Sequence, residues 1–189
     1  MIEDRDERRL AGLMQRWQEG DTAAFDEIYL STAGAVTGYL GRWFGSGGAA
    51  DLVQETYLRV LEARRTYRTD MPFRPWLFAV ARHVALDAYR RRRRGSDREF
   101  VPEEMPEIPV KAPAEEHMDG ARLLAAARKL PPNQHEVVWL ARVEGMTSVE
   151  IGKIVGASPG AVKVRLHRAT AKLKAMLGDA GRGAGRSEP

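Results

Sequence analysis

The side chains best suited to chemistry in this sequence are cations gathered in one stretch near the C-terminus, residues 147–174. The second half of that stretch has no acid, and its cations are Lys163, Arg165, His167, Arg168, Lys172 and Lys174. A helix that carries charge of this one sign suits the phosphate backbone of DNA. The stretch therefore predicts DNA contact; an amphipathic helical hairpin with a solvated basic face is the alternative.

Two short helices are expected to position these cations. Thr147 and Glu150 fit a capping box at the start of the first helix, and Gly156 suits the backbone at its end. Ser158 is suited to cap the second helix and Pro159 to occupy its first turn. A single buried stripe is expected from apolar residues at helical spacing, namely Val162, Leu166, Ala169 and Leu173. The pattern predicts a helix-turn-helix whose second helix enters the major groove.

A second group of cations ends a long helix expected over about residues 73–94. Pro75 suits its first turn, and its apolar stripe is expected to contain Trp76, Leu77, Val80 and Val84. Five arginines follow at residues 90–94. Like charges suit the C-terminal end of the helix dipole but repel one another, so they favour contact with phosphates. A frayed, solvated helix end is the alternative.

The remaining elements are helical as well, so the predicted fold is all-α. Amphipathic helices are expected before Gly20 and after Asp21, with a break at residues 45–48 and a new helix opening at Asp51. Residues 95–117 hold seven acids and four prolines, which is typical of a linker. We expect two small helical domains, residues 10–94 and 118–177, joined by this acidic Pro-rich linker and followed by a disordered tail, residues 178–189. The second domain contains the helix-turn-helix.

Several classes of function are disfavoured by composition. The absence of cysteine excludes disulfides, Cys-ligated zinc and thiol catalysis, and four scattered histidines make another metal site a poor prospect. No Walker-type loop and no G-x-S-x-G motif is present, so we expect neither an enzyme nor a cofactor. The first twenty residues are too charged for a signal peptide, and no apolar run approaches the ~20 residues that span a bilayer. We expect a cytoplasmic protein without membrane insertion.

Four segments, taken together and in order, resemble the extracytoplasmic-function sigma factors of the sigma-70 family over about residues 10–177. They are GDTAAFDEIY (20–29), DLVQETYLRVLEAR (51–64), FRPWLFAVARHVALDAYRRRRR (73–94) and LPPNQHEVVWLARVEGMTSVEIGKIVGASPGAVKVRLHRATAKL (130–173). The resemblance implies a protein that binds bacterial core RNA polymerase, through its β′ clamp helices and β flap, and directs promoter-specific initiation. It also implies an anti-sigma factor that holds the protein inactive until a signal arrives.

The resemblance further implies three sets of contact residues. Polymerase docking falls on Asp51, Gln54, Glu55 and Arg59. Recognition of the −10 element, with a base flipped into the loop at residues 67–72, falls on Tyr67, Arg68, Thr69, Asp70, Trp76, Arg82, His83, Arg90 and Arg91. Recognition of the −35 element falls on Ser158, Pro159, Lys163, Arg165, His167 and Arg168. A stand-alone helix-turn-helix regulator that binds duplex operators is the competing hypothesis, and an adaptor that makes only protein contacts is a third.

Overall fold

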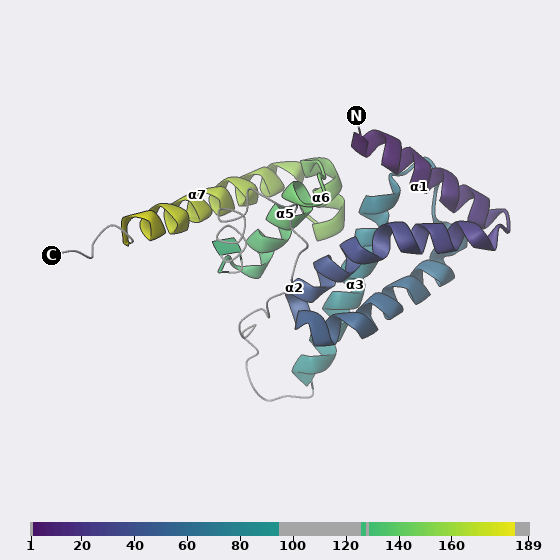
Figure 1. The fold of residues 1–189 in the computed structure, drawn as a ribbon, viewed down its shortest axis with the longest axis horizontal. Helices are drawn as coiled ribbons and strands as arrows, with labels where there is room; N and C mark the ends of the chain where they lie inside the picture. Colours follow the sequence, from purple (N-terminus) through teal and green to yellow (C-terminus); the bar gives the residue numbers. More distant parts are fainter. Residues whose placement is uncertain (1, 95–125, 128, 184–189) are drawn as a thin grey trace. The chain divides into compact units, whose positions relative to one another are not determined.

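The computed structural model describes residues 2–94, 126–127 and 129–183, and within these ranges it contains helices but no strand. The prediction of an all-α fold is confirmed. The chain divides into an N-terminal and a C-terminal compact unit. The elements are α1 (Ile2–Gln18), α2 (Thr22–Glu62), the 3-10 helix η1 (Ala63–Thr66), α3 (Phe73–Arg94), α5 (Pro132–Arg142), α6 (Ser148–Val155) and α7 (Pro159–Gly183) (Figure 1).

The N-terminal unit packs α1, α2 and α3 around one hydrophobic core. Four residues of α1 are buried in this core, namely Leu10, Leu13, Met14 and Trp17. The buried face of α3 was predicted only in part, because Trp76 and Val80 are only half-buried. The prediction is confirmed for Leu77 and Val84, which are fully buried. The other fully buried positions of α3 are Phe73, Phe78, Ala81 and Ala85.

Helix α2 reverses its direction, although its helical hydrogen bonding runs from Thr22 to Glu62. The ring centroids of Tyr29 and Tyr57 lie 4.7 Å apart, whereas 28 residues of straight helix would separate them by about 42 Å. Thr32 Oγ1 also lies 2.8 Å from Tyr57 Oη. Figure 1 shows the two halves of α2 running back along each other. The predicted interruption at residues 45–48, with a separate helix opening at Asp51, is therefore wrong as an end of helical structure. The glycine-rich segment lies near the reversal.

The beginning of α2 follows the expectation from sequence. Asp21 Oδ1 accepts a hydrogen bond from the N–H of Ala23, which satisfies one of the orphan donors at a helix N-terminus. The Asp21 carboxylate also pairs with Arg16 at 2.6 Å, and this hydrogen bond holds the pKa of Asp21 below its usual value. The turn between α1 and α2 is thus fixed by one side chain that both caps and pairs.

The C-terminal unit contains α5, α7 and the part of α6 up to Gly152. A cluster of small and apolar side chains fixes α7 in this unit, namely Ala126, Ala127, Leu130, Ala169 and Leu173, with Val138, Met176 and Leu177 packed against them. The predicted disordered tail is wrong for residues 178–183, because α7 continues to Gly183. The predicted linker, residues 95–117, and the end of the tail, residues 184–189, lie outside the described residues. Over the described part of the chain, no helix is long and apolar enough to cross a membrane.

Candidate nucleic-acid interface

The turn between α6 and α7 has the backbone features expected of a helix-turn-helix. Thr147 Oγ1 accepts from the N–H of Glu150 at 3.3 Å, and the Glu150 carboxylate accepts from the N–H of Thr147 at 2.8 Å. Gly156 ends α6 in the left-handed conformation with φ 67°. Ser158 Oγ then accepts from the N–H of Ala161 at 3.2 Å at the start of α7. The predicted capping box, turn glycine and second cap are confirmed.

The same turn depends on a second glycine that the sequence analysis missed. A Cβ atom placed on Gly152 would lie 2.5 Å from the carbonyl oxygen of Ala157. The N–H of Ala157 donates to the carbonyl oxygen of Gly152 at 3.0 Å, so the two backbones are held in direct contact. Glycine inside a helix is ordinarily unfavourable by about 1 kcal/mol, and an isolated helical glycine often marks such a close approach. That rule was the available signal.

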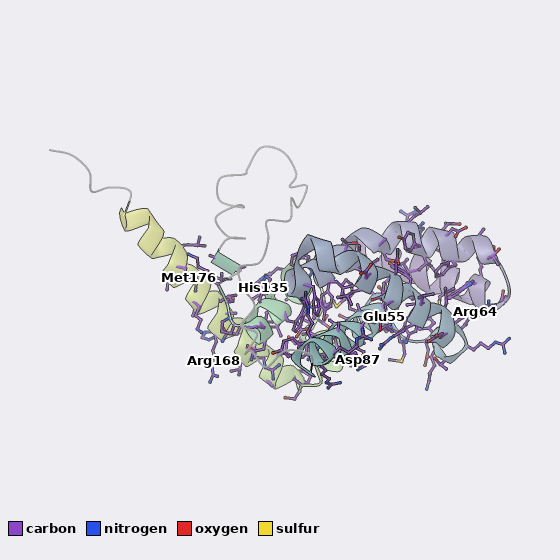
Figure 2. The ribbon with its side chains drawn as sticks, turned by 90° about the horizontal axis from the view of Figure 1, so that it is seen from below. Glu55, Arg64, Asp87, His135, Arg168 and Met176 are labelled. Carbon is purple, nitrogen blue, oxygen red and sulfur yellow. The ribbon has the colours of Figure 1, made fainter. Side chains whose placement is uncertain are left out.

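The cations of α7 flank an outward face. At about 100° per residue, Lys163, His167 and Lys174 lie within about 40° of one another on one side of the helix. Arg165, Arg168 and Lys172 lie within about 60° of one another on the other side. Lys163, His167 and Arg168 are exposed, whereas Arg165 is half-buried; Arg168 is labelled in Figure 2. Ser158 and Pro159 are exposed at the start of the helix. Val164, which is 50% exposed, lies between the two basic sides.

The expected buried residues of the helix-turn-helix are mostly inside. Ile151, Ile154, Val162, Ala169 and Leu173 are buried. Leu166 is half-buried. Val149 is 54% exposed, because it lies on the outer side of the short helix α6. The basic faces of α7 are consequently held on a rigid support.

The loop at residues 67–72 has a buried side and an exposed side. Tyr67 is 4% exposed, its ring packing 5.7 Å from that of Phe73 and 5.0 Å from that of Trp76, and its hydroxyl donates to the carbonyl oxygen of Met71. Burial raises the pKa of Tyr67 to about 12. With its ring buried, Tyr67 forms the floor of the loop in this structure. The base contact that the resemblance implies for Tyr67 stays a prediction.

The exposed side of this loop carries an ion pair. Arg68 Nη2 lies 2.7 Å from Asp70 Oδ2, and Arg68 Nε donates to Asp70 Oδ1 at 3.0 Å. This bidentate pairing lowers the pKa of Asp70 and raises the pKa of Arg68. Thr69, between them, is exposed. The loop therefore presents a donor-rich and acceptor-rich edge above an aromatic floor, which suits the edge and face of an unstacked base.

On α3, the expected contact residues follow a spacing of seven. Trp76, His83 and Arg90 lie on one side of the helix, since seven residues are close to two turns. Trp76 is half-buried, His83 and Arg90 are exposed, and Arg82 is half-buried beside them. This side of α3 leads from the aromatic floor to the arginines at the helix end. Arg91 is also exposed.

A network of ion pairs connects α3 to the second half of α2, and it joins two sets of residues that the sequence analysis treated separately. Arg59 donates to Glu55 at 2.7 Å and to Asp87 at 3.0 Å. Arg91 donates to Glu55 at 3.0 Å, and Arg90 donates to Asp87 at 3.3 Å. Figure 2 labels Glu55 and Asp87, the two acids between which the arginines are shared. The expected docking residue Glu55 therefore contacts the expected DNA residue Arg91, and Arg59 shares the Asp87 carboxylate with Arg90.

The network fixes the charge state of its central groups. The hydrogen bond from Arg59, with the charges of Arg59, Arg90 and Arg91, lowers the pKa of Asp87. Desolvation lowers the pKa of Arg59, but hydrogen bonds to Asp87 and Glu55 outweigh it and raise that pKa. Asp87 is thus ionised at neutral pH and offsets part of the positive charge at the end of α3. The sequence analysis did not single out Asp87, because its partner Arg59 is 28 residues away.

The other expected docking residues are accessible. Asp51 and Gln54 are exposed on the same half of α2 that carries Glu55 and Arg59. Apolar side chains stand exposed on α2 as well, with Leu30 at 79%, Leu58 at 59% and Leu61 at 43%. Gln54, Leu58 and Leu61 are spaced by four and three residues, so they lie along one side of the helix. Among the described residues, no group of three or more acids and histidines is placed to hold a metal ion.

An all-α chain with a capped helix-turn-helix and a basic second helix belongs to the DNA-binding proteins of transcription. Comparison with known proteins gives the family. Residues 28–95 match the model of sigma-70 region 2, and residues 120–173 match that of sigma-70 region 4. The chain therefore belongs to the sigma-70 family, and within it to the extracytoplasmic-function (ECF) sigma factors, which act with core RNA polymerase on promoter DNA.

Individual relatives agree with this assignment. The RNA polymerase sigma factor CarQ of Myxococcus xanthus is 36% identical over 88% of this chain and 96% of its own length. The ECF sigma factor SigF of Caulobacter vibrioides is 34% identical over 90% and 93% of the two chains. Among solved structures, CnrH in complex with the cytosolic domain of CnrY is similar with a TM-score of 0.63 and 28% identity, over 92% of this chain and 97% of that one.

Proposed function

We propose that this ECF sigma factor initiates transcription by reading two promoter elements with separate units, the −10 element with α3 and the preceding loop and the −35 element with α7. The observation that carries the proposal is that one chain holds two exposed basic helix surfaces on two compact units. Each surface alone would bind DNA with modest affinity. When polymerase holds the two surfaces on one promoter, they bind more tightly together, because the second contact becomes intramolecular.

In the −35 reader, Lys163, Arg165, His167 and Arg168 would contact the major groove and its phosphates. Ser158 and Pro159 would bring the positive end of α7 against the backbone, where its N–H groups favour an anion. A correct bidentate base contact discriminates by roughly 1–3 kcal/mol, whereas phosphate contacts only position the helix. Arg165, half-buried and so more restricted than its neighbours, is our candidate for a base contact.

In the −10 reader, Arg68, Thr69 and Asp70 would read the edge of a flipped base, over the floor formed by Tyr67 and Trp76. His83 and Arg82 would lie along the same strand, and Arg90 and Arg91 would hold phosphates. Reading an extruded base suits single-stranded DNA, because unstacking exposes both its hydrogen-bonding edge and its aromatic face. The proposal assigns to Tyr67 a supporting role.

For polymerase docking, Asp51, Gln54, Glu55 and Arg59 would bind the β′ clamp helices. The exposed Leu58 and Leu61 beside Gln54 support this, because an apolar strip next to acids is typical of a surface covered by a protein. The C-terminal unit would contact the β flap. The polymerase supplies the catalysis, so the chain itself need not be an enzyme, and its place of action is the cytoplasm.

The proposal includes an anti-sigma factor that covers these surfaces until a signal arrives. CnrH, to which this chain is similar, was solved in complex with the cytosolic domain of CnrY. An inhibitor bound over Leu58 and Leu61 would compete directly with polymerase. The division of the chain into domains at residues 10–94 and 118–177 with a linker at 95–117 belongs to the same proposal.

The test is transcription in vitro with purified core polymerase on a genomic library, with the chain added or omitted. Specific transcripts that require the chain, and whose start sites share two upstream elements, are the expected result. The competing function, a stand-alone regulator, predicts tight binding to a palindromic duplex without polymerase and no stimulated transcript. That outcome would overturn the proposed function.

A further inference from the structure

The first helix, α1, is hydrogen-bonded to the beginning of the loop at residues 67–72. The side-chain amide of Gln18, the last residue of α1, donates to the carbonyl oxygens of Arg64 at 2.7 Å and Tyr67 at 2.9 Å. In return, Arg64 Nη2 donates to the carbonyl oxygen of Gln18 at 3.0 Å, satisfying an orphan acceptor at the end of α1. Three hydrogen bonds between segments 46 to 49 residues apart therefore fix where the loop starts.

The same helix is also hydrogen-bonded to the residues that follow that loop. Glu7 Oε1 accepts a hydrogen bond from the backbone N–H of Arg74, 67 residues away, at 3.0 Å. Arg74 is in the first turn of α3, where N–H groups have no intrahelical partner, so Glu7 acts as a cap supplied from another helix. The negative charge of Glu7, after burial, contributes to the raised pKa of Tyr67, the floor of the loop.

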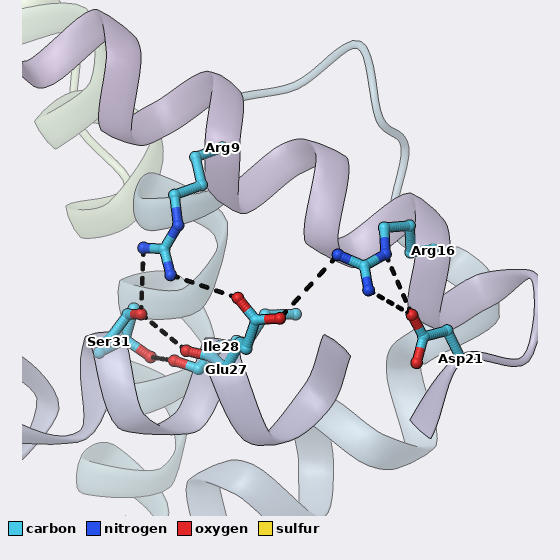
Figure 3. Close-up of polar contacts among 7 residues, drawn as sticks. Arg9, Arg16, Asp21, Glu27, Ile28 and Ser31 are labelled. Atoms are coloured by element: carbon cyan, nitrogen blue, oxygen red, sulfur yellow. Dashed lines mark hydrogen bonds and ion pairs between the residues drawn. The ribbon is translucent and has the colours of Figure 1, made fainter. Parts of the chain in front are cut away.

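Helix α1 is itself held firmly against α2. Four of its apolar residues are buried in the core. On the solvent side, Arg9 donates to Ser31 at 3.3 Å and to Glu27 at 3.5 Å, and Arg16 pairs with Asp21 at 2.6 Å and with Glu27 at 3.9 Å (Figure 3). A helix fastened on both its apolar and its polar side can serve as a fixed reference for the loop.

We propose that α1 is a brace that sets the shape of the loop at residues 67–72, with Gln18 and Glu7 as positioning residues for recognition of the −10 base. The inference rests on the proposed function, since it assumes that this loop reads the base. It extends that function to a helix outside residues 28–95, the segment that matches the region 2 model. Neither Gln18 nor Glu7 would touch DNA; each acts through backbone atoms at one end of the loop.

The loop has other restraints as well: the N–H of Tyr67 donates to the carbonyl oxygen of Ala63 at 3.2 Å, and the Tyr67 ring packs against Phe73 and Trp76. Within the loop, Arg68 pairs with Asp70 and the Tyr67 hydroxyl donates to the carbonyl oxygen of Met71. The N–H of Met71 donates to the carbonyl oxygen of Arg68. The contacts from α1 differ from these, because they tie both ends of the loop to a helix that is far from it in the chain. Releasing one end would leave the loop intact but displaced, and a base pocket tolerates little displacement.

The decisive variant is Gln18→Met, which keeps the length of the side chain and removes both donors. Its control is Gln15→Met, on the exposed side of the same helix, where the amide contacts only Glu19 in the described structure. Initiation is measured with core polymerase on a promoter selected by the unmodified chain and on versions changed at single −10 bases. We expect Gln18→Met to reduce discrimination at one base about tenfold, from two lost hydrogen bonds, with unchanged affinity for core. Gln15→Met should discriminate like the unmodified chain.

Glu7 offers a rescue experiment. Glu7→Gln retains an oxygen that can accept from Arg74, whereas Glu7→Ala does not, so discrimination should fall for Glu7→Ala and largely return for Glu7→Gln. Unchanged discrimination in both Gln18→Met and Glu7→Ala would overturn the brace. A loss of core binding and of base reading together, with a lowered melting temperature, would also overturn it, because that result describes general destabilisation.

Hydrogen exchange separates failure of the brace from failure of the proposed function. The amides of residues 68–71 should exchange faster in Gln18→Met than in Gln15→Met, with no polymerase or DNA present. If the unmodified chain supports no initiation, the proposed function falls and the assignment of base reading falls with it. Equal exchange in the two variants overturns the brace even when initiation is normal.

Discussion

Replacing Asp87 with asparagine should strengthen binding of single-stranded DNA by the N-terminal unit. Asp87 accepts hydrogen bonds from Arg59 and from Arg90, and it stands beside the basic end of α3. Asparagine keeps the shape and one acceptor oxygen but removes the negative charge. Arg90 then loses its ion-pair partner, and an approaching phosphate no longer meets a fixed anion.

The size of the effect follows from distance and exposure. Two unit charges 3.3 Å apart, the separation of Arg90 and Asp87, attract by about 1.3 kcal/mol in water. The side chains are 65% and 39% exposed, so screening and side-chain entropy reduce this to roughly 0.2–1 kcal/mol. We expect a gain in affinity of about 1.5- to 5-fold at low salt. If Arg90 gains one phosphate, the slope of log affinity against log salt should steepen by about 0.7.

The measurement is fluorescence anisotropy of a labelled single-stranded oligonucleotide, titrated at several salt concentrations without polymerase. Asp26→Asn is the matched control, because Asp26 is exposed on α2 and forms no ion pair in the described part of the structure. It changes net charge equally, far from Asp87 in the sequence. Equal gains and equal salt slopes for the two variants would refute the reasoning, because the effect would then be one of net charge alone.

Four further results are expected. Gly152→Ala should destabilise the C-terminal unit by roughly 1–3 kcal/mol, because the new Cβ would collide with the Ala157 carbonyl oxygen. Gly160→Ala is the control: its Cβ would come no closer than 3.9 Å to Ser158, so it should be neutral or stabilising by up to about 1 kcal/mol. Thermal unfolding followed by circular dichroism measures both. Lys163→Ala or Arg165→Ala should lower transcription from promoters with an intact −35 element; a loss that is the same on promoters with a scrambled element would count against the assignment. Asp51→Ala and Leu58→Ser should weaken binding to core polymerase in a pull-down while leaving anisotropy with single-stranded DNA unchanged. Asp21→Asn should be less stable than the unmodified chain at neutral pH, and the difference in free energy of unfolding should shrink as pH falls. The reason is that folding lowers the pKa of Asp21, so its contribution is complete above the unfolded value of about 3.9 and is lost as pH drops through the folded pKa. Urea unfolding at a series of pH values would measure this difference.

The helix-turn-helix could be predicted from sequence because its signals are local. The box of Thr147 and Glu150, the left-handed Gly156 and the cap at Ser158 each involve residues within four positions of one another. Such bonds depend on side-chain type and spacing alone. Gly152 was missed because the atom that excludes a side chain there belongs to the backbone of the following turn.

The N-terminal unit was harder to predict because its decisive contacts are long-range. Glycines at 45–48 correctly marked a change in the chain, but whether helical bonding stops or bends depends on how the two halves of α2 pack. The resemblance implied a role for Tyr67 in DNA recognition, but it gave no sign that the neighbouring Phe73 and Trp76 bury its ring. The sequence around Glu7 reads as a charged N-terminus, and only the fold shows that its carboxylate caps α3.

The shared acids on α2 and α3 have a consequence for how the two activities relate. Glu55 accepts from Arg59 and from Arg91, so a polymerase group that binds the Glu55 carboxylate competes with Arg91 for it. Arg91 released in this way becomes available to phosphate. Because coupling between binding free energies is reciprocal, DNA that binds Arg91 must increase the affinity of polymerase for Glu55 by the same factor.

A double-mutant cycle of Glu55→Gln and Arg91→Met, measured as DNA affinity with and without core, isolates this coupling. Since both side chains are partly exposed, with Arg91 at 61% and Glu55 at 29%, we expect a coupling of at most about 1 kcal/mol. Additive effects of the two substitutions would show that docking and DNA binding use the network independently.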